Sequence, residues 1–249
     1  MENTTMENTR TKTTRNSLIL LLTAAIWGMA FVSQSKGMDY MHPFTFNGVR
    51  SLIGAASILV YILISRKIAG DKAAPLDWKL NVKAGLLCGI FLTIASTLQQ
   101  FGIKYTSVGK AGFITTLYII FVPMFGIFLK KKVAPVVWAA AVMAAVGMYL
   151  LCMTESLRLG AGDIMVFLCA IAFAIQIMTV DHYAARIDGA VVSCIQFTVC
   201  GVVCCIGALI WGQPTFGQLQ EGLGALLYAG VLSCGVGYTL PVSYTHLTL

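Results

Sequence analysis

Apolar runs of about twenty residues alternate with short polar segments along most of the chain. Residues 111–129 show this pattern clearly, because they carry no charge and end at three consecutive lysines, 130–132. At ~1.5 Å per helical residue the run is ~28 Å long, close to the hydrocarbon thickness of a bilayer. Pro123, in its middle, lacks a backbone N–H, which predicts a kink at that point. The run therefore predicts a transmembrane helix.

Seven further runs repeat the pattern, so the sequence predicts an all-α polytopic membrane protein with about eight transmembrane helices. Pro43 suits the first turn of the second helix, and Asp163 is placed to cap the sixth. Residues 1–16 are polar and predict a cytoplasmic tail. The expected spans are residues 17–35, 44–65, 84–103, 111–129, 135–153, 164–180, 190–211 and 222–240.

Lysine and arginine are distributed unevenly between the two sides of this arrangement. If the N-terminus is cytoplasmic, the cytoplasmic side holds twelve of them, in the tail and after the second, fourth and sixth spans. The outer side holds four, and Arg50 lies inside a span. Such an excess is typical of cytoplasmic loops. We therefore expect a multi-pass protein of the inner (plasma) membrane with a cytoplasmic N-terminus.

The composition excludes several function classes. Only 11% of the residues are charged and 58% are hydrophobic, which leaves too few charges to coat a soluble domain. The net charge of +7 is explained by the basic ends of the spans, so no nucleic-acid partner is expected. The eight cysteines lie in or beside apolar runs, as small buried hydrophobes do. No catalytic motif is present, and no histidine or carboxylate joins Cys200 and Cys204, so we expect no enzyme, metal or cofactor.

A weak internal repeat relates the two halves of the chain. Residues 84–93 match residues 224–233 in size and polarity, and at a similar offset Arg50 falls opposite Gln196. The suggested unit has five spans, and an odd number inverts the second copy in the membrane. Inverted repeats are typical of secondary transporters, although a chance similarity is the alternative explanation.

Several motifs add a family resemblance to this pattern. They are Ala25-Ile-Trp27-Gly28, Asn47-Gly-Val-Arg50, Phe121-Val-Pro123, the segment 138–151, and Gly160 to Asp163 followed by Cys169-Ala-Ile-Ala172. In this order, over about residues 18–240, they resemble the EamA-type permeases of the drug/metabolite transporter superfamily. The resemblance implies two inverted five-helix repeats, here residues 17–154 and an incomplete second repeat of three spans, residues 162–240.

The chain departs from this family at two places. Members often carry Gly-Glu after the fourth span, where Lys130 and Lys131 stand here, so no role of that glutamate is carried over. The family has ten spans, whereas this chain stops in the eighth. Residues 241–249 also differ from the segment that the repeat predicts there. We therefore expect a C-terminally truncated sequence with a non-native tail at 241–249.

Arg50 is the most informative single residue, because a charge ~10 Å inside a span is costly unless it is paired or hydrated. Small and polar residues accompany it at three- and four-residue steps: Asn47, Ser51, Gly54, Ser57 and Tyr61. This stripe should face the helix bundle. No carboxylate occupies the middle of a span, so Arg50 favours a substrate with an anionic group. The alternative is an arginine that snorkels or supports packing only.

Other polar or aromatic residues within the spans are candidates for lining the same site. For each of them, a role in helix–helix packing is the alternative. They are Trp27, Ser96, Gln100, Thr115, Thr116, Gln176 and Gln196. Gly85 and Gly89 of the third span are expected only to permit close helix approach.

These observations favour a secondary transporter that moves a small metabolite by alternating access, with an amino acid or another compound bearing an anionic group as the expected substrate. The expected partners are this small molecule and the lipid bilayer, and a second copy of the chain is a further candidate. The competing hypothesis is a membrane protein of another class, namely a sensor, a scaffold or a small intramembrane enzyme. A structure with the polar stripes facing lipid would favour that hypothesis.

Overall fold

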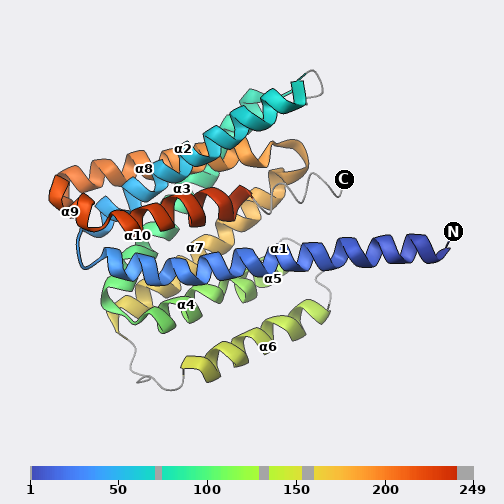
Figure 1. The fold of residues 1–249 in the computed structure, drawn as a ribbon. Coiled ribbons are helices and arrows are strands. Elements are labelled where there is room, and N and C mark those ends of the chain that lie inside the picture. Colours follow the sequence, from blue (N-terminus) through green and yellow to red (C-terminus); the bar gives the residue numbers. More distant parts are fainter. Residues whose placement is uncertain (1, 71–74, 129–134, 153–159, 240–249) are drawn as a thin grey trace.

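The computed structural model describes residues 2–70, 75–128, 135–152 and 160–239, and within these ranges it contains helices and turns but no strand (Figure 1). The helices are α1 (Glu2–Gly37), α2 (Pro43–Ala69), α3 (Trp78–Tyr105), α4 (Val108–Thr116), α5 (Tyr118–Phe128), α6 (Pro135–Cys152), α7 (Ala161–Tyr183), α8 (Gly189–Gly207), α9 (Phe216–Glu221) and α10 (Leu223–Leu227). A 3-10 turn, η2 (Ala184–Arg186), follows α7, and π-helical segments η3 (Ala208–Gly212) and η4 (Tyr228–Val236) extend α8 and α10.

Eight apolar helical stretches are present in the described residues, as the sequence predicts. Six of them are long and apolar enough to cross a membrane, and the stretches 135–147 and 223–239 are shorter. Large apolar side chains cover the outside of the bundle; Leu63 and Leu209, for example, are 61% and 72% exposed. Such a surface suits lipid rather than water. The first helix begins already at Glu2, so the polar segment before the first span is helical.

The sequence predicts an irregularity of the fourth span at Pro123, but the helix is interrupted at Leu117. The fourth span consists of α4 and α5, which are divided at Leu117, whereas Pro123 lies buried inside α5. The backbone tightens at the break, because the N–H of Leu117 bonds to the carbonyl of Ile114, only three residues back. A proline ring crowds the carbonyl four residues before it, so its effect on the backbone falls upstream.

Asp163 stabilises the start of α7, but not from the predicted N-cap position. Gly160 is the N-cap, and Asp163 is the third helical residue. Its carboxylate accepts a hydrogen bond from the Gly160 N–H at 2.9 Å, reaching back over the first turn as the acidic residue of a capping box does. The predicted cap is therefore wrong by three residues, although the carboxylate still serves the helix terminus.

Helices α3 and α8 pack closely against each other. A Cβ atom added at Gly85 would lie 2.7 Å from Ile195, and one at Gly89 would lie 2.8 Å from Val199. Real side chains do not approach so closely, so these glycines allow the two helices to touch. The predicted role of Gly85 and Gly89 is confirmed. From the first contact to the second, the residue number increases on both helices, so α3 and α8 run parallel.

Helices α2 and α8 are antiparallel. Gly48 lies against Cys205, and Gly201 lies against Leu52, so the residue numbers run in opposite senses. Inverted repeats require this direction, because α2 and α8 are the second helices of the two proposed copies. Figure 1 shows the pair side by side at the top of the molecule.

The contacts between helices also follow the proposed repeat. In the proposed repeat, α1 corresponds to α7, α2 to α8 and α3 to η4. The contact between α3 and α8 therefore has a counterpart in the contact between η4 and α2, and both are present. The contact between α3 and α7 likewise has a counterpart in that between η4 and α1, and the α2–α8 pair maps onto itself. The repeat boundaries stay predictions, and the lysines 130–132 and the tail 241–249 lie outside the described residues.

Candidate functional site

Arg50 lies on the inner face of α2 and is only 6% exposed. Its Nε donates a hydrogen bond to Oδ1 of Asn47 at 3.0 Å. The two residues are three positions apart, which brings their side chains together on one helix face. The ring of Phe46 lies 6.0 Å from the guanidinium carbon. The predicted stripe thus faces the bundle at this level, whereas Tyr61, further along α2, is 37% exposed.

A polar network joins Asn47 to two neighbouring helices. The Asn47 Nδ2 group donates to Ser96 Oγ of α3 at 3.0 Å and to Cys204 Sγ of α8 at 3.2 Å. Ser96 also contacts Cys200 Sγ at 3.3 Å, and Ser51 Oγ donates to the same sulfur at 3.5 Å. Three helices therefore meet around the base of the arginine side chain. This network fixes the position from which Arg50 extends.

The guanidinium of Arg50 has no acidic partner in the described part of the chain. The ion pairs found there join Arg66 to Asp188 and Lys110 to Asp163, at opposite ends of α3. Beyond the Asn47 bond, the described residues provide no hydrogen bond to its other nitrogens. A buried, unpaired cation is costly, so the site is complementary to an anionic group.

Neutral polar and aromatic side chains surround the same charge. Arg50 lies close enough to interact electrostatically with the thiols of Cys169 and Cys234 and with the phenol of Tyr238. Tyr238 packs against Trp27, with ring centroids 5.6 Å apart, and Trp27 donates to the Ser233 carbonyl at 3.4 Å. Helices α1 and α7 and the segment η4 thus complete the surroundings of the arginine.

Two glutamines of α3 extend the polar region beyond Ser96. Gln99 donates to Thr115 Oγ1 of α4 at 3.3 Å, and Gln100 donates to the backbone carbonyl of Gln34 in α1, also at 3.3 Å. Thr115 also lies close to the thiol of Cys169, which links it to the neighbourhood of Arg50. Gln99 and Gln100 are 6% and 0% exposed, so both side chains are buried inside the bundle.

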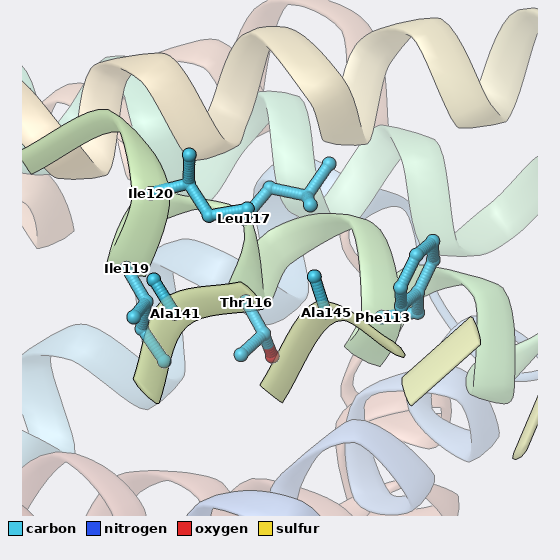
Figure 2. A pocket seen from close by; sticks show the side chains of 7 residues that line it. All are labelled: Phe113, Thr116, Leu117, Ile119, Ile120, Ala141 and Ala145. Atoms are coloured by element: carbon cyan, nitrogen blue, oxygen red, sulfur yellow. The ribbon is translucent and has the colours of Figure 1, made fainter. Parts of the chain in front are cut away.

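Three other predicted site residues form hydrogen bonds that do not include the network around Asn47. Gln176 and Gln196 bond to each other between α7 and α8 at 3.0 Å, a pairing that serves helix–helix packing. Thr116 donates to the Gly112 carbonyl at 2.7 Å within α4. It lines a shallow pocket between α4, α5 and α6, shown in Figure 2. The cavity volume there is only about 10 Å³, room for about one water.

Two polar clusters at the ends of α3 are absent from the sequence predictions. At one end, Asp188 caps α8 by accepting from the Ala190 N–H at 3.0 Å, and it pairs with Arg66 of α2 at 3.6 Å. Its own N–H donates to Asn81 Oδ1 of α3 at 2.8 Å. An aspartate directly before an apolar run is an N-cap signal, but its partners are distant in sequence.

At the other end, Asp163 of α7 joins the connection between α3 and α4. Its carboxylate accepts a hydrogen bond from the Thr106 hydroxyl and pairs with Lys110 at 3.8 Å. Asp163 is 3% exposed, so its hydrogen bonds offset the cost of burying a charge. Each cluster therefore connects helices of the first proposed repeat with helices of the second.

Replacing Asp188 with alanine should lower the free energy of unfolding by about 1–2 kcal/mol, because α8 loses its cap. Arg66→Ala should cost less, about 0–1 kcal/mol, since the ion pair is about one-third exposed to solvent. Denaturant titration of the detergent-purified protein would measure both, with the exposed Glu221→Ala as control. If both variants lowered the free energy of unfolding equally, the ion pair, and not the cap, would account for the stabilising effect of Asp188.

Outside the membrane spans, His42 acts as the N-cap of α2 through Nδ1, which accepts from the Phe44 N–H at 3.4 Å. Burial lowers the pKa of His42, and repulsion from Lys104 lowers it further. The neutral imidazole is therefore favoured, and its ring packs against Phe101 at 5.5 Å. This residue serves the helix terminus rather than the central site.

Comparison with known proteins agrees with this architecture. Residues 15–153, more than half of the chain, match the EamA-like transporter family. An uncharacterized transporter of Archaeoglobus fulgidus is 31% identical over 171 residues, which are 66% of this chain and 48% of the relative. The chain therefore spans about half the length of that relative. An uncharacterized transporter of Clostridium kluyveri is 25% identical, over 89% of this chain and 74% of its own length.

A similar fold occurs among solved structures. One structure, titled only "Crystal structure of protein", superimposes with a TM-score of 0.67 over 93% of this chain and 79% of that one, at 18% identity. This similarity supports the fold alone. Together with the eight apolar helices and the family match, it identifies the molecule as a multi-pass membrane protein. The chain belongs to the EamA-like transporter family.

Proposed function

We propose that this chain is a secondary transporter that moves a small metabolite with an anionic group by alternating access. It lies in the inner membrane with its N-terminus in the cytoplasm, as the uneven distribution of lysine and arginine predicts. The named transporters among its relatives support the permease class. Transport is driven by an ion gradient or by exchange.

One observation carries the proposal: among the described residues, Arg50 is buried without an acidic partner between helices of the two proposed repeats. Secondary transporters place their substrate sites near the midplane at such an interface. A scaffold would have little use for a buried, unpaired cation, because apolar packing is less costly at that position. The polar stripe around Asn47 and Ser96 also faces the bundle and not the lipid.

The two end clusters support alternating access. Asp188 and Asp163 each connect the two repeats, at opposite ends of α3, and both are closed in this structure. Opening one cluster while the other stays closed would expose Arg50 to one side of the membrane at a time. In this scheme, an arrangement with both clusters formed would be the occluded one.

A transport screen tests the proposal. Proteoliposomes that contain the purified chain are loaded in turn with labelled amino acids, dicarboxylates and sugar phosphates, and release is followed with and without an imposed pH or sodium gradient. We expect at least one compound with an anionic group to move faster than in protein-free liposomes. If cationic or uncharged compounds alone move, the assignment of Arg50 as the anion site fails.

A further inference from the structure

Two buried amide oxygens near the central site have no hydrogen-bond donor within the part of the chain that the structure describes. They are Oε1 of Gln34 in α1 and Oε1 of Gln100 in α3, and the two residues are 3% and 0% exposed. Nearly all buried polar atoms in native proteins are paired, so two unpaired acceptors in neighbouring side chains point to a missing donor.

The orientation of the Gln100 amide is set by its surroundings. Its Nε2 donates to the backbone carbonyl of Gln34 at 3.3 Å. Turning the amide over would place Oε1 against that carbonyl oxygen, and two acceptors cannot share a hydrogen bond. The unpaired oxygen of Gln100 therefore points away from the carbonyl of Gln34. The same hydrogen bond holds the two glutamines in one cluster between α1 and α3.

This cluster lies next to the polar network that holds Arg50. The bond between Asn47 and Ser96 fixes the relative heights of α2 and α3, and Gln100 follows Ser96 by one turn, ~6 Å along the helix axis. The Arg50 side chain turns back toward Asn47, as the bond from its Nε shows. The guanidinium is thus on the side of Arg50 that faces the glutamines.

We propose that Gln34 and Gln100 form a second subsite, which accepts hydrogen bonds from an ammonium group of the transported compound. This inference rests on the proposed function, in which Arg50 binds the anionic group of the same compound. An ammonium group has three donors and no acceptor, so it complements oxygens that lack a donor.

The spacing suits a small zwitterion. A molecule whose ammonium and carboxylate groups are ~3 Å apart, with a hydrogen bond of ~2.8 Å at each end, spans ~8–9 Å. This length exceeds the ~6 Å rise from Ser96 to Gln100, which leaves room for a lateral offset between the two subsites. An α-amino acid has these dimensions, whereas a simple carboxylate leaves the glutamine oxygens unpaired.

Binding to the detergent-purified chain, measured by calorimetry, tests the second subsite separately from transport. The probes are L-leucine and L-phenylalanine, each with its deaminated acid, 4-methylpentanoate or 3-phenylpropanoate. We expect an amino acid to bind at least about tenfold more tightly than its deaminated acid, because the acid leaves a buried acceptor unpaired. Gln100→Leu should weaken amino-acid binding about tenfold and leave binding of the acid within about twofold.

Two further variants serve as a control for Gln100→Leu and as a second test of the subsite. Thr198→Val removes a polar group from the exposed face of α8 and should change no affinity. Gln34→Leu removes the other unpaired acceptor. It should also weaken amino-acid binding about tenfold and leave binding of the acid within about twofold, which tests the subsite even if Gln100→Leu fails to fold.

Three outcomes would overturn the second subsite. Equal wild-type affinity for acid and amino acid would mean that the glutamine oxygens hold only a water. If Gln100→Leu weakened binding of the amino acid and of the deaminated acid equally, Gln100 would serve helix packing alone. Absence of amino-acid binding, while other anionic compounds bind through Arg50, would reject the ammonium subsite and leave the proposed function standing.

Discussion

Replacing Arg50 with alanine should reduce transport of an anionic compound by about 100-fold or more. Removing one member of a buried charge pair leaves the other charge uncompensated, at a cost of about 3–5 kcal/mol. Each tenfold change in affinity corresponds to about 1.4 kcal/mol. The cost of about 3–5 kcal/mol therefore corresponds to a loss of about 100-fold or more. The measurement is initial uptake into proteoliposomes at substrate concentrations below saturation.

Two further variants separate charge from geometry at this position. Arg50→Lys keeps the positive charge but lacks the fork of guanidinium donors, so it should retain a small part of the activity. Asn47→Asp puts a carboxylate beside the guanidinium at the place where Nε now bonds to Oδ1 at 3.0 Å. It would neutralise the anion site from within and should also abolish transport. An Arg50→Ala protein that elutes as a monodisperse peak and transports normally would refute the role of Arg50.

The helix faces were predictable from the sequence because they depend on local periodicity. Asn47, Arg50 and Ser51 recur at helical spacing among apolar residues, and all three are buried in the structure. Small residues at four-residue steps, such as Gly85 and Gly89, likewise indicate close contact with another helix. A pattern of this kind identifies the inner side of a helix but does not identify its neighbour.

The partners across the bundle were not predictable, because they depend on tertiary packing. Tyr238 gave no sequence signal, although it lies close enough to interact with Arg50 and packs against Trp27. Gln176 and Gln196, like Ser96, are polar residues inside predicted spans, but they bond to each other instead of to Asn47. A polar residue inside a span has several possible partners, and only the packed structure selects one.

Backbone irregularities were predicted in kind but not in place. Pro123 indicated a disruption of the fourth span, and the structure has one at Leu117. The π-helical segment η4 had no comparable signal. It brings Gly230 and Gly235 against α2, where added Cβ atoms would lie 2.7 Å from Ile53 and 2.9 Å from Ser57. Close packing on α2 accompanies this unusual backbone, and propensity alone does not predict such packing.

Replacing Gly102 with alanine should lower the free energy of unfolding by about 2–4 kcal/mol relative to the matched variant Gly28→Ala. A Cβ atom at Gly102 would lie 2.9 Å from the carbonyl oxygen of Gly162, and it would also collide with Val166. The carbonyl belongs to the backbone of α7, so α3 and α7 must separate. Overpacking of this kind typically destabilises a protein by about 1–3 kcal/mol, or occasionally more. Gly28 lies in α1, where an added Cβ would have no atom of another described helix within 4 Å.

The comparison isolates packing because both substitutions add the same methyl group inside a helix. Each gains the same intrinsic helix propensity, about 1 kcal/mol, and this gain cancels in the difference. Separation of α3 from α7 should also weaken the bond between Thr106 and Asp163, which lies next to the contact. Denaturant titrations of the two purified variants, in one detergent, measure the difference. Equal unfolding midpoints would show that α3 and α7 do not touch at Gly102, and the arrangement of the two repeats around α3 would then be wrong.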